Sequence, residues 1–272
     1  MSGVLYVVGT PIGNLSDASE RMKTVLSEVD FIAAEDTRVT LKLLNHFGIK
    51  KPMVSYFEHN LKQKGLEIVG RIEGGENCAI VSDAGMPCVS DPGEDLVRLC
   101  AERNIKTVVV PGPTALISAL AVSGLLTGRF CFEGFLSVNN SSRREHLRKL
   151  LDEDRTMIFY EAPHKLIKTV SDLCEAFGED RKISIVKEIT KIHETVLRLT
   201  LGEAKRFYEE NTPKGEYVLV VEGKKEEKKE LSLEDALVLA REYLEKGLPR
   251  TEAAKKAAKE SGFAKSEIYK EL

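Results

Sequence analysis

Several patterns are missing from this sequence, and each absence excludes a class of protein. The five cysteines stand far apart, with no C-x-x-C pair and no histidine at ligand spacing, which argues against a metal site and favours free thiols in a reducing cytoplasm. The longest apolar stretch, 115–126, is shorter than the ~20 residues of a membrane-spanning helix, and no basic segment precedes the apolar residues at the N-terminus. We therefore expect a soluble, cytoplasmic protein with no membrane contact and no bound metal.

A strong charge of one sign is also missing. The chain has 40 basic and 43 acidic residues, so its net charge is −3 and it has no overall attraction for nucleic acid. Any site for a polyanion must then be local. With 272 residues, of which 42% are hydrophobic, the chain is long enough for two compact domains or one large one.

The order of apolar runs and helical patterns predicts three parts. Runs at 4–8, 31–34, 79–81 and 107–110 alternate with amphipathic segments, which is typical of an α/β domain with a mostly parallel sheet over 1–112. A break at 111–113 opens a second α/β domain, 113–223, in which closer strands predict hairpins and a mixed sheet. After a charged tether at 224–230, residues 231–272 predict a small helical appendage that begins at the cap Ser232-x-x-Asp235.

Three loops rich in glycine and proline follow predicted parallel strands of the first domain, at 9–14, 82–93 and 111–115. Ligands of open α/β sheets bind beyond the carboxyl ends of the strands, so these loops can share one crevice. The first loop matches neither the dinucleotide fingerprint nor a P-loop, and on its own it is equally typical of a tight turn. The loop SDAGMPCVSDPG at 82–93 is longer than the usual ~2–6 residues, and its rigid, small-residue backbone suits an adenine or amino-acid group better than a catalytic cluster.

A series of motifs in order along the chain carries a family resemblance. They are VGTPIGNLSD (8–17), AEDTR (34–38), SDAGMP and SDPG (82–93), VPGPTA (110–115), FEGFL (132–136), YEAPH (160–164) and KEITK (187–191). Together they resemble the ribosomal RNA small-subunit methyltransferase I family of the tetrapyrrole-methylase superfamily, whose members are class III methyltransferases. The resemblance runs from residue 4 to about 222, and the segment 253–269 is similar to the family's small helix-turn-helix extension.

The resemblance implies an enzyme that moves the methyl group of S-adenosylmethionine to the ribose 2′-hydroxyl of a cytidine in the decoding region of 16S rRNA. It implies two α/β domains with the cofactor in the cleft between them, and a homodimer. The cofactor-binding residues that it implies are Pro11, Ile12, Gly85, Met86, Val89, Thr114, Ala115, Tyr160 and Gly215. The superfamily often has an Asp where this chain has Met86, and this departure matches the RNA-modifying branch rather than a tetrapyrrole substrate.

Methyl transfer to a hydroxyl needs alignment and a proton acceptor, for which carboxylates after strands are candidates. Glu35 and Asp36 follow the second predicted strand, and Glu161 follows the strand at 156–160. Asp36 and Glu161 are the predicted catalytic residues, although each could equally cap the helix that follows it. Arg38 is predicted to hold an adjacent phosphate. His164 is more typical of a surface or capping residue than of a base.

Two basic clusters are predicted to bind the rRNA or the assembled small subunit. Arg143, Arg144 and Arg148 belong to a segment of local charge +3 at 143–149, and Lys255 and Lys256 belong to another at 246–272. Each cluster alone could be a solvated surface. Two rival functions stay open: methylation of a small tetrapyrrole in the same cleft, and binding of RNA without catalysis.

Overall fold

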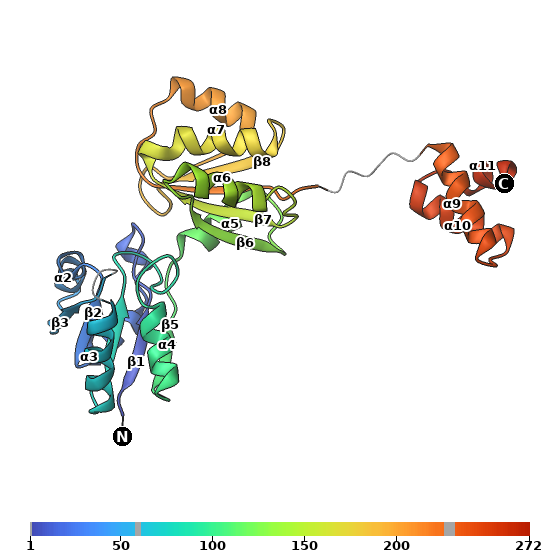
Figure 1. Cartoon of the computed structure of the whole chain (residues 1–272). Helices are drawn as coiled ribbons and strands as arrows, with labels where there is room; N and C mark the ends of the chain where they lie inside the picture. Colours follow the sequence, from blue (N-terminus) through green and yellow to red (C-terminus); the bar gives the residue numbers. More distant parts are fainter. Residues whose placement is uncertain (1, 58–60, 226–231) are drawn as a thin grey trace. The chain divides into compact units, whose positions relative to one another are not determined.

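The structure, a computed structural model, describes residues 2–57, 61–225 and 232–272 (Figure 1). The chain divides into two compact units, Met1–Lys224 and Lys225–Leu272. The first unit contains two five-stranded sheets, and the second contains helices. Most of the predicted tether lies outside the described residues. Within the described residues, no helix is long and apolar enough to cross a membrane.

The first sheet is parallel throughout, as the continuous apolar runs predict, and its strand order is β3-β2-β4-β1-β5. Its strands are β1 (Val4–Val8), β2 (Phe31–Ala34), β3 (Met53–Ser55), β4 (Cys78–Val81) and β5 (Lys106–Val110). Because β4, β1 and β5 are neighbours, the three loops that follow them leave the sheet side by side. We call this sheet and its helices the first lobe.

Helices cover both faces of the first sheet. They are α1 (Glu20–Glu28), α2 (Thr37–His46), α3 (Leu61–Glu73) and α4 (Glu94–Glu102), with a short 3-10 turn η1 (Leu15–Asp17) before α1. One apolar cluster joins α1 and α2 to the face of the sheet that carries Ile32 and Val81. A second cluster joins α3 and α4 to the opposite face, which carries Leu5 and Ile80. Both faces of β1, β2 and β4 are therefore covered, which is why these three strands consist of uninterrupted apolar residues, whereas the edge strand β5 begins with the exposed Lys106 and Thr107.

The second sheet is mixed, as predicted, with the order β6-β7-β10-β8-β9. Its strands are β6 (Phe130–Phe135), β7 (Thr156–Glu161), β8 (Lys182–Lys187), β9 (Thr195–Thr200) and β10 (Tyr217–Val221). Only the β6–β7 pair is parallel among the described strands of this sheet. We call this sheet and its helices the second lobe.

The helices of the second lobe also pack on two faces. They are α5 (Ala115–Ser123), α6 (Asn140–Lys149), η2 (Pro163–Lys165), α7 (Leu166–Phe177) and α8 (Leu201–Glu210). The large core cluster buries one sheet face beneath α6, α7 and α8. The other face carries Ile158 and Val218, and it packs on Ala119 and Leu120 of α5. Helix α5 follows β5 directly, so the chain passes from one lobe to the other at the third glycine- and proline-rich loop.

The second unit is a three-helix module formed by α9 (Leu233–Glu245), α10 (Arg250–Ser261) and α11 (Lys265–Glu271). The predicted cap is present, since the Asp235 N–H donates to the Ser232 hydroxyl over 3.1 Å. Small residues and Ile268 form its core, so the helices approach closely. Gly262 ends α10 in the left-handed region at φ 80°, which an L side chain rarely adopts.

Candidate functional site

The three loops after β4, β1 and β5 lock together through their backbones. Thr10 and Gly85 exchange two hydrogen bonds, of 2.8 Å and 3.1 Å, and the Gly9 N–H donates to the Val110 carbonyl over 3.0 Å. Gly9 and Gly112 touch so closely that a Cβ on Gly112 would lie 2.7 Å from the carbonyl carbon of Gly9. The loops therefore need glycine where they cross, and they present a nearly fixed backbone surface.

The loop at 82–93 is held in conformations that side chains seldom adopt. Cys88 and Ser90 have φ angles of 74° and 63°, and Gly85 and Gly93 also have positive φ. Such backbone persists only where the surrounding packing enforces it, and it is concentrated at functional sites. Here it leaves Val89 exposed and directs it into a cavity.

A cavity of about 920 Å³ opens between these loops and the second lobe, and we call it the interlobe cavity. The first lobe and α5 contribute Ile12, residues 84–86 and 89–91, and residues 114–117. The second lobe contributes the end of β7 with residues 162–164, the start of β10, and Phe132, Phe135, Val186 and Ile189. The cavity has the size of ligand sites and a mainly apolar wall with a few polar groups.

The cavity brings together most of the residues predicted for the cofactor: Ile12, Gly85, Met86, Val89, Thr114, Ala115 and Tyr160. Pro11 is not among its lining residues, but it precedes Ile12. Gly215 is not among them either, although its neighbour Glu216 is. The Glu188 side chain occupies the space where a Cβ of Gly215 would lie, at 2.6 Å, so this glycine accommodates Glu188 instead.

Asp36 and Arg38 form a pair outside the cavity lining. The Asp36 carboxylate caps α2 by accepting the Arg38 N–H over 2.8 Å, and the Arg38 guanidinium also donates to it over 2.6 Å. These hydrogen bonds from Arg38 lower the pKa of Asp36 to about 2. The capping alternative of the sequence analysis therefore describes Asp36, and the Arg38 guanidinium already has a carboxylate partner.

Glu161 lines the cavity, but its carboxylate belongs to a buried network. It accepts the Ala162 N–H over 2.9 Å and the hydroxyl of Thr169. The Thr169 hydroxyl accepts a 2.6 Å hydrogen bond from the Arg143 guanidinium, which also forms an ion pair with Asp172. Glu161 is 3% and Arg143 is 4% exposed. Arg143 also lines a groove between α6 and α7, but its guanidinium is already held by Thr169 and Asp172, so its contacts favour support of the second lobe over the predicted binding of RNA.

The carboxylates of Glu35, Asp83 and Asp91 lie close to one another, the first after β2 and the other two in the loop after β4. Asp83 Oδ1 accepts the Asp36 N–H over 3.1 Å, and Glu35 Oε2 accepts the Asp83 N–H over 3.3 Å. Burial raises the pKa of both Glu35 and Asp83. Asp91 lines the cavity, and burial, followed by the charge of Glu35, raises its pKa to about 6. Asp91 was not among the predicted site residues, although it is a carboxylate between Ser90 and Pro92 in the loop suspected of binding a ligand.

Three aromatic rings form part of the second-lobe wall. The Tyr160 ring lies in edge contact with Phe132 and Phe135, at centroid distances of 4.9 Å and 5.7 Å. The Tyr160 hydroxyl accepts the Leu116 N–H over 3.2 Å, which fixes this ring against α5. Phe135 is 56% exposed even though it lines the cavity.

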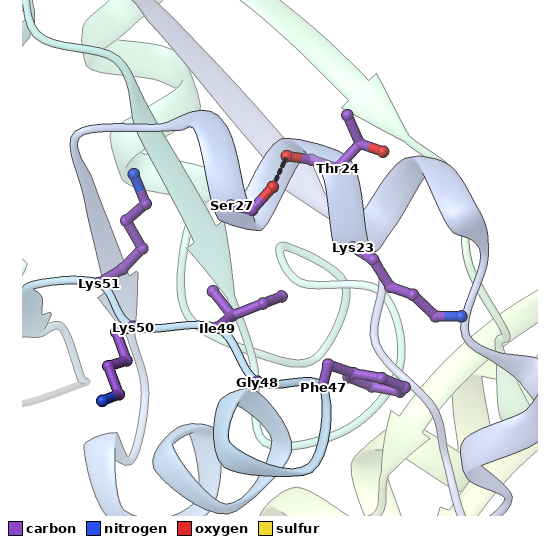
Figure 2. A pocket seen from close by; sticks show the side chains of 8 residues that line it. All are labelled: Lys23, Thr24, Ser27, Phe47, Gly48, Ile49, Lys50 and Lys51. Atoms are coloured by element: carbon purple, nitrogen blue, oxygen red, sulfur yellow. Dashed lines mark hydrogen bonds between the residues drawn. The ribbon is translucent and has the colours of Figure 1, made fainter.

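A smaller hollow of about 380 Å³ lies on the first lobe, over α1 and the turn after α2 (Figure 2). Figure 2 shows Lys23 on one side of it and Lys50 and Lys51 on the other. The Lys23 ammonium is 2.7 Å from a carboxylate oxygen of Glu20. Lys50 and Lys51 lie at the amino end of β3, away from the strand ends where ligands of such sheets bind. The interlobe cavity is therefore the better candidate site.

The remaining predicted RNA contacts lie on two helices. Arg144 and Arg148 are exposed on α6 and border a groove of about 700 Å³ between α6 and α7, together with Lys168. Lys255 and Lys256 are exposed on α10 in the three-helix module. Among residues 2–57, 61–225 and 232–272, no group of three or more His, Cys, Asp or Glu side chains could hold a metal ion.

Comparison with known proteins adds sequence relatives along nearly the whole chain. Residues 4–205 match the model of the family Tetrapyrrole (Corrin/Porphyrin) Methylases. The chain is 46% identical to "Ribosomal RNA small subunit methyltransferase I" of Synechocystis sp. over 98% of this chain and 96% of the relative. It is 43% identical to the protein of that name from Escherichia coli O157:H7, over 98% of this chain and 94% of the relative.

Another relative of the same name, from Thermotoga maritima, is 46% identical over 222 residues, which are 82% of this chain and 99% of the relative. Solved structures share the fold at low identity. A uroporphyrin-III-C-methyltransferase from Thermus thermophilus matches with a TM-score of 0.58 and 18% identity, over 81% of this chain and 94% of that one. A diphthine synthase matches with a TM-score of 0.60 and 16% identity, over 82% and 90%.

Proposed function

Because this chain belongs to the ribosomal RNA small subunit methyltransferase I family of the tetrapyrrole (corrin/porphyrin) methylases, we propose that it methylates small-subunit rRNA with S-adenosylmethionine. More specifically, we propose that the methyl group goes to the ribose 2′-hydroxyl of a cytidine in the decoding region of 16S rRNA. The observation that carries the proposal is the interlobe cavity, in which three backbone-rich loops of the first lobe face the aromatic wall of the second.

The residues of the cavity fit the proposed cofactor, which when bound supplies a methyl group already activated by a positively charged sulfur. Gly85 leaves the backbone open, since a Cβ there would lie 3.2 Å from the Ile12 side chain. Ile12, Met86 and Val89 offer apolar surface for an adenosyl group. The nearby carboxylates Glu35, Asp83 and Asp91 make the local potential negative, which favours a cationic methyl donor over its neutral product.

We propose that Asp91 accepts the proton of the ribose hydroxyl. Asp36 is held by Arg38, and Glu161 is held by the Ala162 N–H and the Thr169 hydroxyl, so both predicted bases already receive strong donors. Asp91 also lines the cavity, and burial raises its pKa to about 6 even though the Ser82 side chain hydrogen-bonds to it, a value close to that of a general base at neutral pH. Glu161 then acts as a positioning residue that fixes the turn at 162–164.

The proposed RNA contacts are Arg144 and Arg148 on α6 and Lys255 and Lys256 on α10. Arg144 and Arg148 are one helical turn apart and exposed, so both can reach phosphates on one strand. The Thermotoga relative aligns over 222 residues, about the length of the first unit alone. This supports an accessory role for the three-helix module, which would add backbone contacts to a self-sufficient catalytic unit.

By analogy with the family that the chain resembles, we also propose a homodimer that acts in the cytoplasm. The Thermus structure of a uroporphyrin-III-C-methyltransferase shares the fold at 18% identity, so a small tetrapyrrole is the rival substrate. The relatives at 41–46% identity bear the rRNA methyltransferase name, which favours RNA.

The test offers one methyl-labelled cofactor sample to several acceptors. These are small ribosomal subunits and naked small-subunit rRNA from cells lacking the gene, the same RNA from cells that carry it, and uroporphyrinogen III. We expect label in RNA from the deficient cells and none in RNA that is already methylated. Label in the porphyrinoid would favour the rival. If calorimetry detected RNA binding but no affinity for S-adenosylhomocysteine, a non-catalytic RNA-binding function would replace the proposal.

A further inference from the structure

At the edge of the interlobe cavity, strand β6 has one unpaired extra residue between two positions that pair with consecutive residues of β7. Phe132 pairs with Ile158, Gly134 with Phe159 and Phe135 with Tyr160, so the register shifts at Glu133. Gly134 has φ 63°, a left-handed conformation that suits glycine at such a β-bulge. Bulges of this kind redirect the side chains that follow them, and they are common beside active sites.

The bulge changes the face on which Phe135 lies. In a regular strand, residues three apart point to opposite faces, so Phe132 and Phe135 would be on opposite sides of the sheet. With the extra residue, both rings contact Tyr160 and both line the cavity. The Glu133 carboxylate instead accepts a 2.8 Å hydrogen bond from Nε2 of His146 on α6.

Phe135 lies on the wall of the cavity and is not part of a buried core cluster. More than half of it is exposed, and it contacts the Tyr160 ring at a centroid distance of 5.7 Å. An exposed aromatic ring on the wall of a ligand cavity is typical of a contact completed by a flat, apolar partner. The Leu116 N–H donates to the Tyr160 hydroxyl and fixes the position of that ring. The Tyr160 ring in turn supports the Phe135 ring in edge contact.

The bulge also lies beside the loop that carries the proposed base. A Cβ on Gly134 would be 3.5 Å from the Ser90 hydroxyl oxygen, and Ser90 precedes Asp91. The charge of Asp91 also contributes to the raised pKa of Tyr160, after the larger effect of burial. The cavity wall that carries Phe135 and Tyr160 therefore lies beside the loop that carries Asp91.

We propose that the bulge at Glu133 and Gly134 turns Phe135 into the interlobe cavity as a stacking platform for the nucleobase of the target nucleotide. The inference rests on the proposed function and names the part of the RNA that this wall holds. An enzyme that modifies a ribose within folded RNA must draw one nucleotide into its site, and proteins hold such splayed bases on aromatic rings. The adenine of the cofactor is also a planar aromatic ring, so the test must distinguish stacking of this adenine from stacking of the RNA base.

The experiment compares the full-length wild type with Phe135→Ala, Phe135→Tyr and the control Phe130→Ala. Phe130 is on the same strand and 37% exposed, but it is not among the residues that line the cavity. For each protein, steady-state methyl transfer to small subunits from cells lacking the gene gives kcat and KM for the RNA substrate. Calorimetry gives the affinity for S-adenosylhomocysteine.

We expect Phe135→Ala to lower kcat/KM for the RNA substrate about 5- to 150-fold, the range for loss of one base–aromatic stack, with unchanged S-adenosylhomocysteine affinity. Phe135→Tyr should retain most activity, and Phe130→Ala should match the wild type. The proposal is wrong if Phe135→Ala has wild-type kcat/KM, or if it weakens S-adenosylhomocysteine binding and leaves the RNA parameters unchanged. A wild-type enzyme that transfers no methyl group to RNA would refute the proposed function itself, and the stacking role with it.

Discussion

Replacing Arg143 with alanine tests whether this residue supports the fold or binds RNA. Its side chain is 5% exposed and its guanidinium pairs with Asp172, whose side chain is 26% exposed. Removing one partner of a buried ion pair costs about 3–5 kcal/mol. Because water can reach Asp172 once Arg143 is gone, the low end applies. The Thr169 hydroxyl also loses a donor, which adds about 1 kcal/mol, so we expect a loss of roughly 3–4 kcal/mol.

For a unit of 224 residues, each kcal/mol lowers Tm by about 2–4 °C, so Arg143→Ala should lower it by roughly 6–16 °C. Scanning calorimetry of the full chain measures this directly. The matched control is Arg148→Ala on the exposed side of α6, which should change Tm by less than about 2 °C and instead raise KM for the RNA substrate. A normal Tm for Arg143→Ala, combined with an increase in KM like that of Arg148→Ala, would refute the structural role and restore the prediction from charge.

Two further predictions concern the proposed base and the three-helix module. Because burial and the charges of Glu35 and Asp83 raise the pKa of Asp91 to about 6, we expect kcat/KM to fall as pH drops below about 6, and Asp91→Asn to remove this dependence with an activity loss of about 10²–10⁴-fold. The pKa of Asp91 in the folded protein exceeds its ordinary value of 3.8, so the ionised carboxylate destabilises the fold above that pH. At pH 7.5 we therefore expect Asp91→Asn to be more stable than the wild type by about 1 kcal/mol after allowing for solvent screening, and below about pH 4 to be no more stable. Wild-type activity of Asp91→Asn across this pH range would rule it out as the base. Removing residues 225–272 should leave S-adenosylhomocysteine affinity unchanged and raise KM for the RNA substrate about tenfold, with a smaller dependence on salt; a loss of cofactor affinity would instead show that the module supports the cavity.

Much of the fold can be predicted from the sequence because buried parallel strands require continuous apolar residues. Strands β1, β2 and β4 each show such a run, and the edge strand β5 ends with one at 108–110 although it is largely exposed; glycine- or acid-containing loops follow all four. Strand β3 does not, because it is a three-residue edge strand whose residues are only half-buried. The shared crevice of the three loops followed from the rule for strand ends, and the structure brings these loops together in one cavity.

The site is less predictable, since its charges depend on partners distant in sequence. Counting charges at 143–149 could not reveal that Arg143 meets Asp172, 29 residues further along the chain. The sequence also does not show that the Thr169 hydroxyl, eight residues further along the chain in α7, donates to the Glu161 carboxylate. The position of the Phe135 ring in the cavity could not be predicted either, because regular alternation would place Phe135 and Phe132 on opposite faces of the sheet. The glycine inside the strand was the available sign of a bulge.

Mass mapping of the modified nucleotide tests the central claim most directly. Small-subunit rRNA from cells lacking the gene is incubated with the purified protein and S-adenosylmethionine, digested, and compared with untreated RNA. The account predicts one added methyl group, on the ribose of a cytidine in the decoding region, which Asp91→Asn adds about 10²–10⁴-fold more slowly than the wild type in a single-turnover time course. A methyl group on a base, or RNA left unmodified by a protein that binds S-adenosylhomocysteine, would contradict it.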